Sequence, residues 1–107
     1  MSRGIDRERK IRKALKDAGW VAIRASMGEI DVVACKPVSV RHDITLSEVR
    51  FIQVKSTAQS PYERFGPSDR KELSDLARAA GATAWLIWWP PRKGWRWIEE
   101  SQWPRAK

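Results

Sequence analysis

Apolar residues recur at helical spacing near the start of the chain. Ile11, Ala14, Leu15 and Ala18 fall on one side of a helix over residues 6–18, and Arg and Lys fill most of the other positions. This pattern predicts an amphipathic helix with a basic outer surface. Gly19 is expected to end it, because glycine adopts the backbone conformation of a helix C-terminus without strain.

The chain then changes to patterns typical of strands. Residues 20–24 and 30–35 are short apolar runs, and residues 26–28 are expected to connect them. Residues 37–47 are polar and irregular in pattern, so we expect a loop there. Residues 49–55 are rich in Val, Ile and Phe, which favour strands. The three runs together predict a three-strand meander.

A second helix and two more strands complete the pattern. Residues 68–80 have apolar positions on one side, with Ser68 as the expected N-cap and Gly81 as the stop. Residues 84–89 and 95–98 are expected to be strands, separated by a proline and glycine turn. The predicted order is αβββαββ, an α+β fold (α/β in the broad sense) with a mixed sheet of about five strands flanked by helices.

Composition narrows the class of protein. The 107 residues suit a single domain, residues 1–107. Lys and Arg number 21 against 13 Asp and Glu, a formal charge of +8, which favours nucleic acid as the partner. No apolar run approaches the roughly 20 residues that span a bilayer, and the start of the chain lacks a secretory signal. We expect no membrane and a soluble, cytoplasmic protein, in the host cytoplasm if the chain is viral. Cys35 is expected to be a buried structural thiol.

Four polar residues stand out against this pattern. Glu8 lies on the helix side that carries Ile11 and Leu15, where an unpaired carboxylate is costly to bury. Asp31 interrupts an apolar strand, and the period of two puts Gln53 and Lys55 on one face of the next strand. The structural alternatives are a first-turn carboxylate that meets the helix dipole and a solvated sheet face. Taken together, the four residues indicate a polar site or a bound cation.

Asp31 followed by Gln53-Val54-Lys55, with Glu8 on a preceding helix, resembles the PD-(D/E)XK signature of restriction-endonuclease-like nucleases. The order and spacing of the flanking residues resemble the archaeal Holliday junction resolvases over about the first 90 residues. The segments that carry this resemblance are Arg3-Gly4, Glu8, Ala14-Leu15, Gly19-Trp20, 22–26, 28–34 and 52–56. Two residues depart from the family pattern: Gln53 replaces the usual Glu, and Ile30 stands where Pro is common.

The resemblance implies a metal-dependent, structure-selective DNA endonuclease that introduces paired symmetric nicks in four-way junctions. It implies Mg²⁺, with Mn²⁺ able to replace it, held by Asp31, Gln53, the Val54 carbonyl and Glu8. Lys55 would orient water and stabilise charge, and Ser26 would contact the DNA backbone near the cut. Glu8, Asp31, Gln53, Lys55 and Ser26 are therefore the expected catalytic residues. Gln53 brings no charge to the metal, a deficit that Glu29 would compensate.

Branched double-stranded DNA is the expected partner, and cutting two strands symmetrically implies a homodimer. Seven tryptophans are expected in the core or a dimer interface, the latter formed by the aromatic strand 84–89 with the second helix, rather than stacking on bases. The alternatives are another nuclease of this fold acting in repair or restriction, and a DNA-binding relative without catalysis. The candidate DNA contacts are Arg3, Arg7, Arg9, Lys10, Arg24, Arg41, Ser56, Arg64, Arg70 and Lys71.

Overall fold

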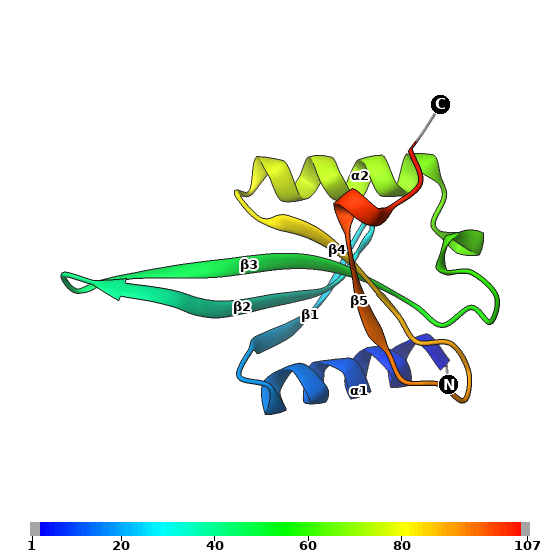
Figure 1. The fold of residues 1–107 in the computed structure, drawn as a ribbon, viewed down its shortest axis with the longest axis horizontal. Helices are drawn as coiled ribbons and strands as arrows, with labels where there is room; N and C mark the ends of the chain where they lie inside the picture. Colours follow the sequence, from blue (N-terminus) through cyan, green and yellow to red (C-terminus); the bar gives the residue numbers. More distant parts are fainter. Residues whose placement is uncertain (1–2, 106–107) are drawn as a thin grey trace.

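The protein forms one mixed sheet with a helix on each face (Figure 1). The computed structural model describes residues 3–105, with side chains for residues 6–25 and 28–105. The elements are α1 (Arg3–Asp17), β1 (Val21–Met27), β2 (Ile30–Arg41), β3 (Ile44–Lys55), η1 (Pro61–Arg64), α2 (Pro67–Ala79), β4 (Thr83–Trp88), β5 (Arg96–Glu99) and η2 (Glu100–Gln102), where η marks a 3-10 helix. The predicted order αβββαββ is confirmed.

The sheet has five strands in the order β1-β2-β3-β4-β5. The first three strands form the predicted antiparallel meander. β3 and β4 run parallel, and β5 returns antiparallel to β4. Because β3 and β4 are parallel, they end at the same edge of the sheet, and α2 connects the end of β3 to the start of β4. β2, antiparallel to β3, begins at that edge.

Alternating residues of the strands point to opposite faces of the sheet and form two separate hydrophobic cores. On the α1 side, Ile11 and Leu15 are fully buried against Val32, Ile52 and Ile87. Each such side chain contributes roughly 1.5–3 kcal/mol of burial free energy. Ala18, expected in this stripe, is exposed, because the helix ends at Asp17 and Gly19 turns the chain with φ of +96°.

The second core lies under α2. Phe65, Leu73 and Ala77 pack there with Leu86 and Trp103. The prediction that Ser68 is the N-cap is wrong. Gly66 is the N-cap residue, and Pro67 lies in the first turn of the helix. Proline suits that position because its fixed φ is already helical and its missing N–H would have no partner there.

The structure overturns the expected loop over residues 37–47. These residues extend β2 and β3 into a long two-stranded arm, with Val40 paired to Thr45 and Arg41 to Ile44 (Figure 1). His42 and Asp43 form its two-residue turn, with φ of 49° and 66°, the left-handed geometry that closes tight hairpins. A register shift follows Pro37, which has no N–H for regular pairing.

The expected connection over residues 26–28 is likewise shorter than predicted. β1 continues to Met27, and the turn to β2 consists of Gly28 and Glu29. Gly28 has φ of +56°, a conformation that favours glycine. The turn therefore brings Glu29 next to the first residues of β2.

The aromatic residues at the α1 side are packed together, as the sequence predicted for the core. The Trp97 ring lies 5.3 Å from Trp85 and 6.0 Å from Trp20. The Arg50 guanidinium stands over all three rings, 3.8 Å from the Trp85 centroid, and pairs with Glu48 at 2.6 Å. Such stacking adds about 0.5–2 kcal/mol for each desolvated cation.

Two further expectations concern single features. Cys35 is partly exposed, not buried, because alternation along β2 turns its neighbour Ala34 into the α1-side core and leaves Cys35 outside both cores. No helix in the described part of the chain combines the length and apolar character needed to cross a membrane.

Candidate active site

The residues singled out by sequence meet at the edge of the sheet where β3 and β4 end. Asp31 is the second residue of β2, and Gln53 and Lys55 close β3. The antiparallel register pairs Val32 with Ile52, so Asp31 and Gln53 come next to each other beyond that pair. Topology thus brings together side chains that are more than 20 positions apart in sequence, as the spacing of the motif predicted.

Asp31 is a partly buried carboxylate tied to the neighbouring strand. Its Oδ2 accepts a hydrogen bond from the Val54 backbone N–H at 2.8 Å. Burial, with the nearby Glu8 and Glu29 carboxylates, raises the pKa of Asp31 from an ordinary 3.8 to about 6. The Val54 hydrogen bond and the Lys55 charge act in the opposite direction and do not cancel it. A carboxylate held in this way gains from a nearby cation.

Gln53 is almost fully buried, with 5% of its surface exposed. Its Nε2 donates a hydrogen bond to Glu29 Oε2 at 2.5 Å, joining the end of β3 to the turn before β2. Burial, and then the Asp69 carboxylate, raise the pKa of Glu29, while the Gln53 bond and Lys55 lower it. Asp69 and Glu72 come from the first turns of α2, so α2 adds negative charge on this side.

Glu8 projects toward the sheet as its helix position predicted. Its side chain is 14% exposed and lies 3.9 Å from the Arg24 guanidinium of β1. It is near enough to Asp31 to raise the pKa of that carboxyl. The Arg24 ion pair compensates part of the cost of placing Glu8 there.

Two arginine and tryptophan pairs border this edge of the sheet. Arg7 of α1 lies 4.8 Å from the Trp89 ring centroid, and Arg96 of β5 lies 4.8 Å from the Trp88 ring. The backbone N–H of Trp89 donates a hydrogen bond to the Lys55 backbone carbonyl at 2.7 Å, which fixes Trp89 next to the end of β3. Sequence reasoning missed Arg96; its place at the start of the strand beside β4 is set by the sheet pairing, not by any motif.

The expected DNA contacts are distributed unevenly. Arg9, Lys10 and Arg64 are exposed, and Ser56 follows Lys55 at the site edge. The side chains of Arg3 and Ser26 lie outside the described residues. The remaining candidates are held elsewhere: Lys71 pairs with Asp75 at 2.6 Å, Arg41 is at the turn of the arm, and Arg70 is buried.

Arg70 stabilises the segment that leads into α2. It is 9% exposed and donates to the Phe65 carbonyl at 2.6 Å. Its guanidinium also lies 5.7 Å from the Tyr62 ring. Arg70 therefore fixes the segment between η1 and α2, and burial keeps it from reaching a phosphate.

The oxygen atoms at the site fit a hard cation held by mixed ligands. Among the described side chains, no three His, Cys, Asp or Glu residues are grouped so as to hold a metal ion. Mg²⁺ also accepts amide and backbone carbonyl oxygens, which Gln53 and Val54 provide beside Asp31. Burial, and to a smaller extent repulsion from neighbouring carboxylates, raises the pKa values of Asp31 and Glu29, and a bound cation would offset both effects.

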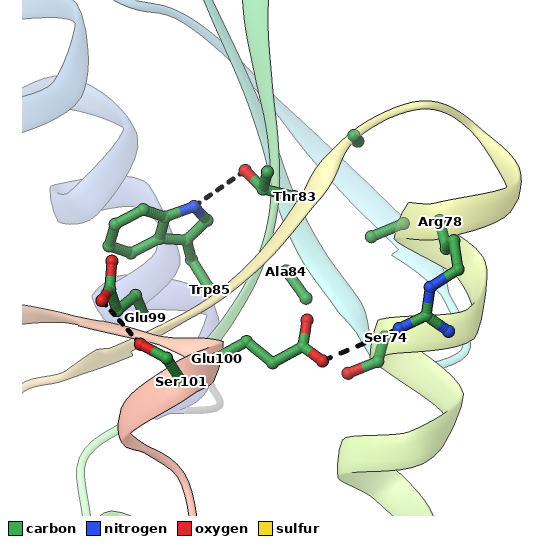
Figure 2. Close-up of a pocket in the computed structure, with 10 residues that line it drawn as sticks. Ser74, Arg78, Thr83, Ala84, Trp85, Glu99, Glu100 and Ser101 are labelled. Carbon is green, nitrogen blue, oxygen red and sulfur yellow. Dashed lines mark hydrogen bonds and ion pairs between the residues drawn. The ribbon is translucent and has the colours of Figure 1, made fainter.

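Two cavities in the described part of the chain lie away from this edge. One of about 290 Å³ opens between α2, β4 and the segment after β5, where Arg78 reaches Glu100 and Trp85 donates to Thr83 (Figure 2). Another of about 860 Å³ runs along α2 and the C-terminal segment. Neither is lined by Asp31, Gln53 or Lys55, as expected for a site that acts on a large ligand at an open edge.

Comparison with known proteins gives a consistent result. A family model described as archaeal Holliday junction resolvase (Hjc) matches residues 1–106. Among solved structures, Hjc of Archaeoglobus fulgidus, a Holliday junction resolvase from an archaeal hyperthermophile, is similar with a TM-score of 0.75 and 24% identity, over 99% of this chain and 80% of that one. No curated protein matches the chain significantly. At this identity the structural likeness establishes the fold, a mixed sheet of five strands with two helices, as predicted.

Proposed function

Because the chain belongs to the archaeal Holliday junction resolvase family, we propose that it is a metal-dependent endonuclease that nicks four-way DNA junctions in symmetric pairs. The observation that carries this proposal is the meeting of Asp31, Gln53 and Lys55 at one edge of the sheet, with Asp31 bonded to Val54. A net charge of +8 suits a polyanionic substrate.

The chain supplies the groups that phosphodiester hydrolysis needs. Asp31, the Gln53 side-chain oxygen, the Val54 carbonyl and Glu8 would hold Mg²⁺, or Mn²⁺ in its place. Such an ion activates water and neutralises charge on the reacting phosphate. Lys55, a cation beside these oxygens, orients the attacking water and stabilises the developing negative charge.

DNA contacts surround this edge. Basic residues at the border of the site bind phosphates and position the duplex without reading its sequence. Arg7 and Arg24 lie at the site itself, and Ser26 would contact the backbone beside the cut. The other proposed contacts are Arg3, Arg9, Lys10, Ser56 and Arg64, together with Lys71, which lies on α2 and pairs there with Asp75. We also propose that the protein acts in the cytoplasm, in a host cell if the chain is viral.

We propose a homodimer, because paired nicks need two sites related by a two-fold axis. The aromatic strand suits an interface poorly: β4 lies inside the sheet, with Ala84, Leu86 and Ile87 buried. A better surface is the α2 side of β1, where Val21 is 64% and Ile23 57% exposed. An Ile23→Lys variant that stays dimeric by light scattering would exclude this surface.

A second candidate function is junction binding without catalysis. It is favoured by Gln53, which leaves β3 without a carboxylate at the site. The two functions differ in one result, since only the first requires strand cleavage when a divalent metal is added.

The test compares labelled four-way junctions of several arm sequences with linear duplexes of equal length, in Mg²⁺, Mn²⁺ or EDTA. The expected result is symmetric paired nicks in either metal, none in EDTA, and junction preference at every sequence. Affinity should fall steeply with salt through counterion release. Binding with no cleavage supports the second function. Equal affinity for linear DNA, or nicks that follow a sequence motif, would overturn both.

A further inference from the structure

At the end of β3, the active site has a neutral side chain where a carboxylate ligand for a metal ion is expected. Gln53 presents a neutral amide, and the nearby Glu8 is already paired with Arg24 at 3.9 Å. Asp31 alone is a weak anchor for a divalent ion, because Mg²⁺ dehydrates reluctantly and is held in proteins mainly by carboxylates. If the proposed function holds, another carboxylate is needed near Asp31.

Glu29 is placed to supply it. Gln53 Nε2 donates to Glu29 Oε2 at 2.5 Å, which orients the amide so that its nitrogen points to Glu29 and its oxygen elsewhere. The bond involves Oε2 of Glu29, and among the described residues Oε1 accepts no hydrogen bond. Glu29 also interacts electrostatically with both Asp31 and Lys55, so it belongs to the same site.

The short distance between the two side chains explains why an amide at position 53 suits a carboxylate at position 29. A glutamate at position 53 would place two carboxylates 2.5 Å apart, which costs free energy unless a proton or a cation lies between them. Gln53 avoids that repulsion. Its amide does not compete with Glu29 for the metal, and its hydrogen bond holds the Glu29 carboxylate in position. In this chain the turn before β2 therefore carries the carboxylate, and the end of β3 carries the amide.

We propose, resting on the function proposed above, that Glu29 is a metal ligand of the active site and that Gln53 positions it. The pair works as one unit: one carboxylate and one amide, joined by a hydrogen bond between adjacent strands. Asp31 and Glu29 then supply most of the negative charge at the metal, and Glu8, which is also paired with Arg24, supplies less. The unit tolerates exchange of its two side chains, since either arrangement keeps one carboxylate beside one amide.

The experiment measures Mn²⁺ binding to the full chain without DNA, from the electron paramagnetic resonance signal of free Mn²⁺. Glu29→Gln removes the charge and keeps an amide in place; we expect Mn²⁺ affinity to fall by about ten-fold or more. Glu72→Gln is the matched control, since Glu72 is an exposed carboxylate near Glu29 that has no bond to Gln53. It should change affinity by less than about two-fold.

The decisive variant is the double exchange Glu29→Gln with Gln53→Glu. It should recover Mn²⁺ affinity to within about three-fold of the wild type, while Gln53→Glu alone should lower the melting temperature in EDTA and regain it when Mn²⁺ is added. Circular dichroism of each variant verifies folding. Wild-type affinity in Glu29→Gln, no recovery in a folded double variant, or no Mn²⁺ binding by the wild type would overturn the assignment.

Junction cleavage by the same proteins separates this inference from the proposed function. A wild type that binds Mn²⁺ through Glu29 and cuts no junction contradicts the proposed function alone. A wild type that cuts junctions while Glu29→Gln retains full Mn²⁺ affinity contradicts the assignment of Glu29 alone.

Discussion

The same two strands behave in opposite ways at their two ends. At the site end, β2 and β3 carry Asp31 and Gln53, polar residues that are wholly or partly enclosed. In the arm they carry Val40 and Ile44, apolar residues that are 73% and 62% exposed. Burial therefore does not follow polarity along this hairpin. It follows where the helices lie, since α1 and α2 cover only one half of it (Figure 1).

The comparison shows what each end contributes. Hairpin pairing alone supports the arm, and its tight turn fixes the register without a core. At the site end, the two cores pack on the two faces of the sheet. This rigid packing holds charged groups close together, although their proximity lowers the stability of the fold. We therefore expect substitutions at the site end to affect activity and stability strongly, and matched substitutions in the arm to have little effect.

The largest difference is expected in catalysis. Asp31→Asn and Lys55→Ala should each reduce junction cleavage by about 1,000-fold, the upper range for loss of one charge-stabilising group. Junction affinity should stay within a few-fold, because basic residues elsewhere provide it. Asp43→Asn makes the same change as Asp31→Asn at the turn of the arm and should cleave normally. A wild-type single-turnover rate in either site variant would show that the site is misplaced.

The next difference concerns packing, and β3 offers a matched pair. Ile52 is fully buried between the strands and α1, while Ile44 in the same strand is 62% exposed. Ile52→Ala should lower the free energy of unfolding by about 2–5 kcal/mol. Ile44→Ala should change it by less than about 0.5 kcal/mol. Urea denaturation measures both, and a similar loss for the two would mean that the arm is buried in solution.

A smaller effect is expected from the charge of Asp31 without metal. Its pKa of about 6 lies above the ordinary 3.8, so its favourable contribution is complete below pH 3.8 and is lost as the pH rises through 6. Asp31→Asn should then be more stable than the wild type at pH 8 in EDTA, by at most about 3 kcal/mol. The gain should shrink toward pH 4, as judged by urea denaturation at both pH values. Equal stability at pH 8 would contradict the burial of this charge.

The smallest effect is expected where the arm leaves the sheet. Arg50 stacks on Trp20, Trp85 and Trp97, and Arg50→Lys keeps the charge while losing the flat guanidinium. We expect a loss of about 1 kcal/mol in stability and a change in tryptophan fluorescence. Arg41→Lys, at the exposed turn of the arm, is the control and should alter neither. An unchanged emission spectrum in Arg50→Lys would show that the stack does not persist in solution.

The sequence alone predicted the order of the elements and the meeting of Asp31, Gln53 and Lys55 at one edge of the sheet. Helical and alternating periods identify which face of each element is apolar, so the order αβββαββ and the meander followed directly. The motif from Asp31 to Lys55 was equally readable, because strand alternation fixes which residues share a face. The arm was missed since Val38, Val40, Ile44 and Leu46 are interrupted by Pro37 and by polar residues, and its tight turn has no glycine.

Tertiary structure decided which of these residues act together. The bond between Gln53 and Glu29 joins residues 24 positions apart, and it depends on strand register and on a turn that was predicted in another place. Arg70 was indistinguishable from other arginines until Phe65 and Tyr62 enclosed it. Local periodicity reports only how each segment divides between core and solvent, whereas distances between segments arise from sheet order and helix placement. Those long-range contacts determine which charges are buried, which are paired, and where a metal ion would be held.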